Sequence, residues 1–155
     1  MSNKQQAKII DKQGNNWLYS EIVKDHFFNP RNILKKQEEG NFKSDGEGRV
    51  GSPACGDEML FMIKVDPNTN KITDCRWQTF GCASAIASTS ILSEMILENG
   101  GMNIEEAKKI TPQDILKRLG GLPPRKIHCS VLGDQALRKA IEDYNNSQPT
   151  VHRSQ

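Results

Sequence analysis

Three of the four cysteines in this chain lie in short motifs rich in glycine, proline and small residues. The motifs read Gly-Ser-Pro-Ala-Cys-Gly-Asp around Cys55, Thr-Phe-Gly-Cys-Ala-Ser-Ala around Cys82, and Leu-Pro-Pro-Arg-Lys-Ile-His-Cys up to Cys129. The cysteines are 27 and 47 residues apart, much farther than those of a compact zinc knuckle. A site that uses all three sulfurs therefore requires a fold that brings three distant segments together.

Each of these cysteines stands where a thiolate can be presented rather than packed. Cys55 follows a turn just before a predicted strand, and Cys82 and Cys129 stand at predicted helix starts. The partial positive charge of a helix N-terminus lowers the pKa of a thiol and favours the metal-binding, nucleophilic thiolate.

A carboxylate and an imidazole accompany the thiols, because Asp57 follows Cys55 by two residues and His128 directly precedes Cys129. Three thiolates with either of these groups make a set of four ligands. Zinc accepts such a set, and an iron-sulfur cluster prefers thiolates but tolerates replacement by other ligands. The spacing alone does not choose between the two.

Length and charge limit the classes of function. The 155 residues suit one domain, since domains usually hold about 100–200 residues. The 21 basic and 19 acidic side chains leave a net charge of +2, which points neither to nucleic acid nor to an anionic membrane. No apolar run approaches the roughly 20 residues of a membrane helix, and residues 1–16 lack the apolar core of a secretion signal. We expect a cytoplasmic protein whose cysteines are reduced.

The apolar pattern predicts one ordered domain over residues 17–144, between disordered tails at 1–16 and 145–155. Residues 17–28 show helical spacing that Pro30 ends, and the charged, glycine-rich stretch 35–49 suits a mobile loop before the first cysteine motif.

The middle of the chain predicts a hairpin followed by helices. Residues 59–65 are apolar, with Phe61, Ile63 and Val65 on one face, and an Asp-Pro-Asn turn separates them from residues 72–80, so the pair predicts an antiparallel hairpin. Helical spacing or capping signals then predict four helices, over 83–97, two short ones within 104–119, and 127–144.

Cys75 and His26 have simpler interpretations. By two-residue alternation Cys75 shares a strand face with Trp77, and we expect it to be a core residue rather than a ligand. His26 lies in the first predicted helix, where it is expected to be a surface or packing residue.

Several motifs in one order resemble the U-type iron-sulfur cluster assembly scaffolds, which include IscU and the N-terminal domain of NifU. The resemblance covers roughly residues 17–144. It is carried by Tyr-Ser-Glu at 19–21, Asn-Pro-Arg-Asn at 29–32, and residues 51–57, 79–88 and 122–132.

The resemblance implies an α+β fold, with a small three-stranded antiparallel sheet packed against several helices and the cysteine loops at one end. It implies assembly of a [2Fe-2S] cluster, or a [4Fe-4S] cluster on a dimer, and its transfer to recipient apoproteins. By matching position, Cys55, Cys82 and Cys129 would be ligands, with Asp57 or His128 in the fourth place. Cys129 would also accept persulfide sulfur.

The partners follow from the same resemblance. A cysteine desulfurase would supply sulfur, and an Hsp70-type chaperone system would recognise the Leu-Pro-Pro-x-Lys motif at residues 122–126. Within that motif Lys126 would contact the site or a partner. The protein would be a non-enzymatic scaffold and carrier, monomeric or weakly oligomeric.

Two other functions suit the same residues. The ligand set also fits a structural or regulatory zinc protein, and zinc is expected to occupy the site when no cluster is present. A sulfur-accepting thiol protein that uses Cys129 is the other alternative. His128 is poorly placed as its base, because adjacent residues at a helix start point in different directions.

Overall fold

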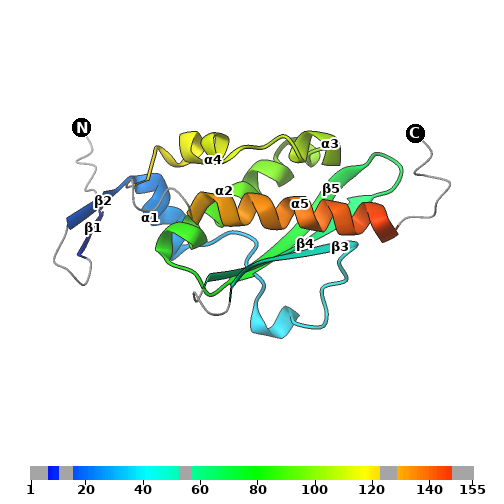
Figure 1. Cartoon of the computed structure of the whole chain (residues 1–155), viewed down its shortest axis with the longest axis horizontal. Helices are drawn as coiled ribbons and strands as arrows, with labels where there is room; N and C mark the ends of the chain where they lie inside the picture. The colour runs from blue at the N-terminus through cyan, green and yellow to red at the C-terminus, as the bar shows by residue number, and fades with distance from the viewer. Residues whose placement is uncertain (1–6, 11–15, 53–56, 123–128, 148–155) are drawn as a thin grey trace.

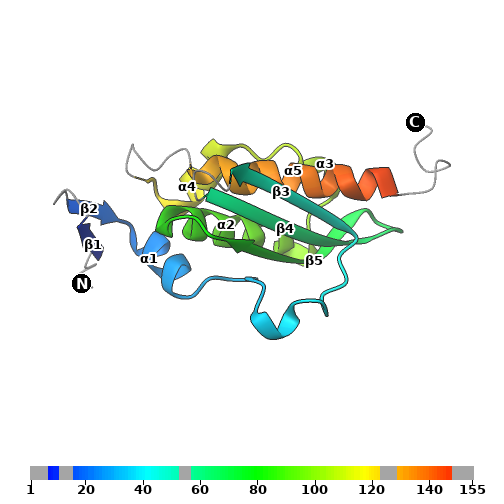
Figure 2. The ribbon, with the colours of Figure 1, turned by 60° about the horizontal axis from the view of Figure 1, so that its bottom comes forward.

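Three antiparallel strands form the centre of the molecule, in the order β3-β4-β5. They are β3 (Gly46–Ser52), β4 (Asp57–Asp66) and β5 (Lys71–Thr79). The computed structural model describes residues 7–10, 16–52, 57–122 and 129–147. Helices α2 (Ala83–Leu97) and α5 (Cys129–Ser147) lie on one face of this sheet, as Figures 1 and 2 show. The predicted α+β class with a three-stranded sheet is confirmed.

The β4–β5 hairpin forms as its alternation predicts. Phe61 pairs with Trp77 and Ile63 with Cys75, and all four side chains are fully buried beneath the helices. Burial of large apolar side chains stabilises a fold by about 1.5–3 kcal/mol each, so this face of the hairpin is the main source of core stability. The prediction that Cys75 packs in the core is confirmed.

The residue pattern did not locate β3, the third strand that the family resemblance implies, because residues 46–49 fall within the expected loop. Its alternation is carried by glycine: Gly46 and Gly48 are buried while Glu47 and Arg49 are exposed. A Cβ atom on Gly48 would lie 2.1 Å from the carbonyl oxygen of Ala136 in α5. The strand therefore uses the absence of a side chain to let the α5 backbone approach.

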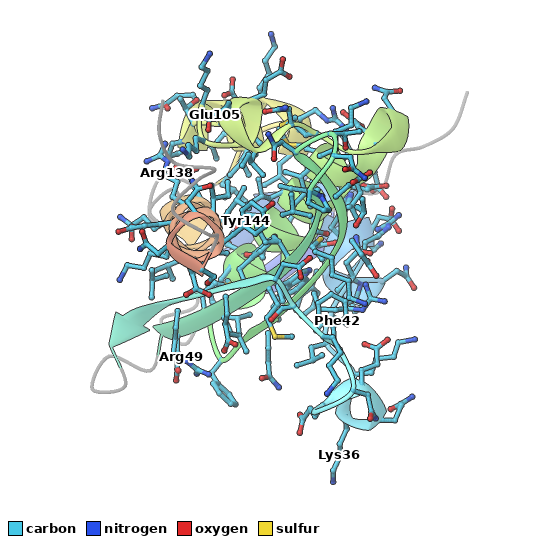
Figure 3. All side chains as sticks on the ribbon, turned by 90° about the vertical axis from the view of Figure 1, so that its right-hand side faces the viewer. Lys36, Phe42, Arg49, Glu105, Arg138 and Tyr144 are labelled. Atoms are coloured by element: carbon cyan, nitrogen blue, oxygen red, sulfur yellow. The ribbon has the colours of Figure 1, made fainter. Side chains whose placement is uncertain are left out.

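The remainder of that stretch is tethered to the outer face of the sheet, and it contains the short helix η1 (Lys36–Glu38). The Phe42 ring lies 4.6 Å from Lys64 Nζ and 5.1 Å from Arg76 Cζ, which are cation–π distances. Figure 3 shows Phe42 turned toward the sheet and Lys36 pointing away from it. The stretch 35–49, predicted as a mobile loop, thus contains the first residues of β3, and Phe42 attaches the part before them to the sheet.

The first helix is shorter than predicted. Helix α1 spans Glu21–Phe28, because Ser20 is its N-cap and accepts a hydrogen bond from Val23 N–H at 3.1 Å. The preceding residues form an antiparallel pair, β1 (Ala7–Ile10) and β2 (Asn16–Tyr19). Part of the expected tail at 1–16 is thus strand, because residues 7–10 pair antiparallel with residues 16–19.

The remaining helices follow the predictions closely. α2 has the predicted bounds, and it is followed by η3 (Glu98–Gly100), α3 (Ile104–Ala107) and α4 (Pro112–Leu119). Thr111 caps α4 and Pro112 is its first residue. α5 continues to Ser147, beyond its predicted end at residue 144. In the described residues no helix is long and apolar enough to cross a membrane.

Candidate metal centre

Two of the cysteine-bearing segments meet at one end of the sheet. Ser52, the last residue of β3, pairs with Asp57, the first residue of β4. Thr79, the last residue of β5, pairs with Met59 of β4. Because α2 begins directly after Cys82, the end of β3, the start of β4 and the β5–α2 connection lie at the same end of the sheet.

The start of α5 lies toward the same end. A Cβ on Gly46 would meet Ala140 and one on Gly48 would meet Ala136, so α5 runs antiparallel to β3. The first residue of α5, Cys129, therefore lies toward the end of β3 that leads to Cys55. Figures 1 and 2 both show the N-terminal ends of α2 and α5 at this end of the sheet.

The predicted ligands are described to different degrees. Cys82 is described with its side chain, which is half-buried and in no disulfide. Asp57 and Cys129 are described as the first residues of β4 and α5. Cys55, His128 and Lys126 lie outside the described residues. Within the described part of the chain no three His, Cys, Asp or Glu side chains gather in a metal-binding group, so the ligand set remains a prediction.

Cys82 has a backbone environment suited to a thiolate. It is the N-cap residue of α2, with extended dihedral angles of −76° and 176°, and its carbonyl accepts the first helical hydrogen bond from Ile86 N–H at 3.1 Å. The N-terminal end of a 15-residue helix carries partial positive charge that favours an anion.

Cys75 provides the contrast. Burial in the core, together with the negative charge of Asp74, raises the pKa of the Cys75 thiol well above its ordinary value. A buried neutral thiol of this kind packs as a small apolar group and is inert. The two cysteines of the β5–α2 segment thus have opposite chemical characters.

His26 is a packing residue, which confirms one of the two expected roles, but its hydrogen bonds were not foreseen. Its ring is buried between α1 and α2, with Nδ1 2.7 Å from Ser90 Oγ and Nε2 3.2 Å from a Glu94 carboxylate oxygen. Ser90 Oγ also accepts a hydrogen bond from Arg31 N–H at 2.8 Å. The sequence offered one sign of these bonds: polar residues occur on all sides of the segment that forms α2. Some of them must therefore be buried, and a buried polar side chain needs a hydrogen-bond partner.

This histidine predicts a loss of stability in mild acid. Burial and the nearby positive charge of Arg31 lower the pKa of His26, and these effects exceed the opposite effects of Glu94 and Asp25. The unfolded chain therefore binds a proton more readily than the folded one. The contribution is complete above the unfolded pKa of about 6.5 and is lost as the pH falls through the lower folded pKa.

Urea unfolding of metal-free protein at about pH 7.5 and 5.5 measures this effect. The wild type should lose more free energy of unfolding over this interval than His26→Gln, whose side chain does not titrate. Equal losses in the two proteins would contradict the prediction.

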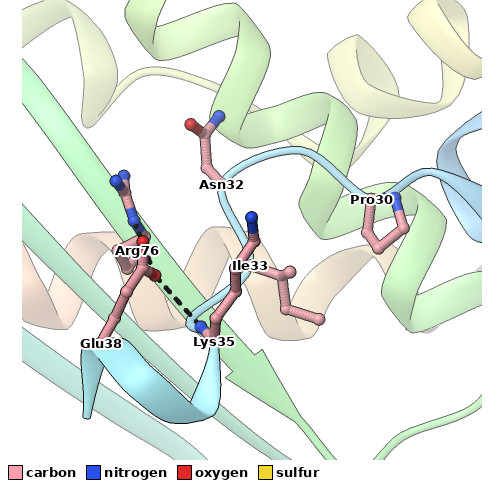
Figure 4. Close-up of a pocket in the computed structure, with 6 residues that line it drawn as sticks. All are labelled: Pro30, Asn32, Ile33, Lys35, Glu38 and Arg76. Carbon is pink, nitrogen blue, oxygen red and sulfur yellow. Dashed lines mark hydrogen bonds and ion pairs between the residues drawn. The ribbon is translucent and has the colours of Figure 1, made fainter.

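A separate pocket of about 190 Å³ lies beside β5, away from the cysteine segments (Figure 4). Glu38 Oε2 accepts hydrogen bonds there from Lys35 N–H at 3.1 Å and from Arg76 Nε at 3.2 Å. Arg76 also donates to Asp74 at 2.7 Å. These bonds fasten the segment after α1 to β5, so the pocket has a structural explanation. It is lined by Pro30, Asn32, Ile33, Lys35, Glu38 and Arg76.

Comparison with known proteins identifies relatives of the whole described domain. The model of the NifU-like N terminal domain family matches residues 18–150. The chain is 48% identical over 136 residues to the iron-sulfur cluster assembly scaffold protein IscU of Aquifex aeolicus, covering 88% of this chain and 82% of that protein. It is 50% identical over 127 residues to IscU 1 of Archaeoglobus fulgidus, another protein named as an iron-sulfur cluster assembly scaffold, covering 82% and 76%.

A solved structure supports the fold independently. The N-terminal NifU-like protein of Brucella abortus superposes with a TM-score of 0.61 over 83% of this chain and 95% of that one. Its sequence identity is 16%, so this similarity concerns the arrangement of strands and helices alone.

Proposed function

The chain belongs to the NifU-like N-terminal domain family, and on that premise we propose that it assembles [2Fe-2S] clusters and transfers them to recipient apoproteins. It would act as a scaffold and carrier rather than as an enzyme, and the names of two relatives describe those proteins as scaffold proteins. The observation that carries the proposal is that the end of β3, the start of β4 and the starts of α2 and α5 lie at one end of the sheet.

The proposed ligands are Cys55, Cys82 and Cys129, with Asp57 or His128 as the fourth. Iron in clusters is held by thiolates, with occasional replacement by other ligands. Cys129 has the further role of accepting persulfide sulfur from a cysteine desulfurase. Its place at the start of a 19-residue helix supports this role, because the helix N-terminus favours the nucleophilic thiolate.

Anaerobic reconstitution tests the proposed function. Apoprotein is incubated with ferrous iron, cysteine, a cysteine desulfurase and excess dithiothreitol, which supplies the electrons that reduce persulfide sulfur to sulfide, and the thiolate-to-iron charge-transfer absorption is followed. A [2Fe-2S] spectrum that can be passed on to an apo-ferredoxin is the expected result. Failure of the wild type to develop this absorption would refute the proposal, while a [4Fe-4S] spectrum from dimeric protein would correct the cluster type.

Asp57 is proposed to make the cluster releasable. A carboxylate binds iron less tightly than a thiolate would, and Asp57 begins β4 where the cysteine segments meet. If Asp57 is the group that makes the cluster labile, Asp57→Ala should give a longer-lived cluster and slower transfer to apo-ferredoxin than the wild type.

His128→Ala is the matched comparison, because His128 is the competing candidate for the fourth ligand. Mössbauer spectra of wild type and both variants show which change alters the iron site. If the Asp57→Ala protein transfers its cluster as fast as wild type, Asp57 does not set the release rate.

A structural zinc protein is the second candidate, and the donor set itself favours it. The described core favours a different role, because Phe61, Trp77 and Leu137 are fully buried in one apolar cluster of the kind that stabilises a domain of this size. We therefore propose that zinc occupies the site in the absence of a cluster without being required for folding. Unfolding on chelation would support the zinc alternative instead.

The proposal also assigns partners and a compartment. Residues 122–126 would be recognised by an Hsp70-type chaperone, with Lys126 contacting the site or that partner. The scaffold would act in the cytoplasm, where thiols stay reduced, as a monomer or weak homo-oligomer.

A further inference from the structure

Thr79, the last residue of β5, connects the turn before Cys82 to the strand that begins at Asp57. Its hydroxyl donates a hydrogen bond to the backbone carbonyl of Glu58 at 2.7 Å and accepts one from Gly81 N–H at 3.0 Å. The single Thr79 side chain thus bridges the residue after Asp57 and the residue before Cys82.

The bridged turn is the point where the chain leaves the sheet. Phe80 N–H donates to the same Glu58 carbonyl at 3.2 Å, which completes the last rung of the β4–β5 ladder. The Gly81 N–H then turns back to the Thr79 hydroxyl, a local pattern that serine and threonine favour in turns. Cys82 follows as the N-cap of α2.

Hydrogen bonding rather than apolar burial organises this turn. Phe80 is its one large apolar side chain, and 74% of that side chain is exposed. Phe80 therefore adds little burial energy that could hold the turn against β4. The Thr79 hydroxyl is only partly exposed, and the β-branched side chain restricts its χ1 rotation, so the hydroxyl is held between its two partners.

We propose that Thr79 is a positioning residue that sets the separation of Cys82 from Asp57 in the metal site. The inference rests on the proposed function, in which both residues are candidate ligands. Thr79 touches neither iron nor sulfide; it acts through the backbone on each side of the site. Removing groups that orient metal ligands typically weakens metal binding about 10–100-fold.

Cobalt titration of the metal-free protein tests the inference directly. Thr79→Val keeps the β-branched shape and removes the hydroxyl, whereas Thr79→Ser keeps the hydroxyl. We expect Thr79→Val to weaken Co²⁺ binding about tenfold and to alter the thiolate-to-cobalt absorption, and Thr79→Ser to restore both. Thr73→Val is the matched control, because Thr73 is exposed on the same strand and its hydroxyl lies 3.4 Å from the Lys64 carbonyl at the opposite end.

Repeating the Co²⁺ titration in the Asp57→Ala variant distinguishes a positioning role of Thr79 from a general destabilisation of the fold. In Asp57→Ala protein the Cys82–Asp57 separation no longer matters, so Thr79→Val should leave Co²⁺ affinity nearly unchanged there. An equal loss of affinity in both backgrounds, or a serine variant that behaves like valine, would overturn the inference. A wild type that binds Co²⁺ with these dependences but never assembles a cluster would instead overturn the proposed function.

Discussion

Gly48→Ala is expected to lower the free energy of unfolding by about 3 kcal/mol, the upper part of the range for overpacked cores. The new Cβ would lie 2.1 Å from Ala136 O and 2.5 Å from Ala140 N, both of them backbone atoms of α5. A side-chain rotation cannot relieve such contacts, so α5 must move away from β3. Urea unfolding followed by circular dichroism measures the loss.

Two variants separate this effect from others. Arg49→Ala changes the next, exposed residue of β3 and should cost less than about 1 kcal/mol. Gly100→Ala introduces a side chain at a φ of 84° with no atom within 4 Å, so it reports backbone strain alone, about 1 kcal/mol. A Gly48→Ala protein as stable as Arg49→Ala would show that α5 does not need the close approach.

Cys82→Ala is expected to abolish stable cluster assembly. Three thiolates are proposed to hold the iron, and loss of the one at the start of α2 leaves two thiolates with weaker ligands. Under anaerobic reconstitution the variant should retain less than about a tenth of the wild-type charge-transfer absorption. Its thermal unfolding should change little, because Cys82 is only half-buried.

Cys75→Ala is the matched cysteine control seven residues earlier. Its thiol is fully buried, so the variant should lose roughly 1 kcal/mol of stability and still assemble a normal cluster. Reversed results, with assembly lost in Cys75→Ala and kept in Cys82→Ala, would contradict the assignment of core and site.

The elements that could be predicted from the sequence are those in which the spacing of apolar side chains shows which face is buried. The β4–β5 hairpin consists of two segments with large apolar residues on one face, separated by a turn, and α2 begins after Gly81-Cys82 and ends before a Gly-Gly pair. In these segments the apolar side chains that identify the element are the same ones that pack it into the core. The α+β class and the bounds of α2 were therefore predictable.

Other elements depend on contacts that hydropathy does not record. In the sequence Gly46 and Gly48 look like loop residues, and only the structure shows that the backbone of α5 packs against them. Ser20 could continue the helical spacing of residues 17–28, but its side chain caps α1 instead. In both places a tertiary or capping contact overrides the local pattern.

The candidate ligands of the site could be predicted from the sequence, but the hydrogen bonds that hold the surrounding backbone could not. The cysteine motifs and the family resemblance named the candidate ligands, whereas the hydroxyl of Thr79 and the buried ring of His26 were not assigned bonding roles. Both side chains bond to partners distant along the chain, such as Ser90 for His26. Such pairs require the fold before they can be recognised.

The glycine contact between β3 and α5 also bears on how far this sequence can drift. Where a helix and a strand are separated by side chains, each substitution in the layer changes their spacing. Here the spacing is set by the missing side chain of Gly48, which lets the Ala136 carbonyl of α5 approach the strand backbone. Position 48 is therefore expected to accept glycine alone, whereas its exposed neighbours Glu47 and Arg49 face solvent and are free of this limit.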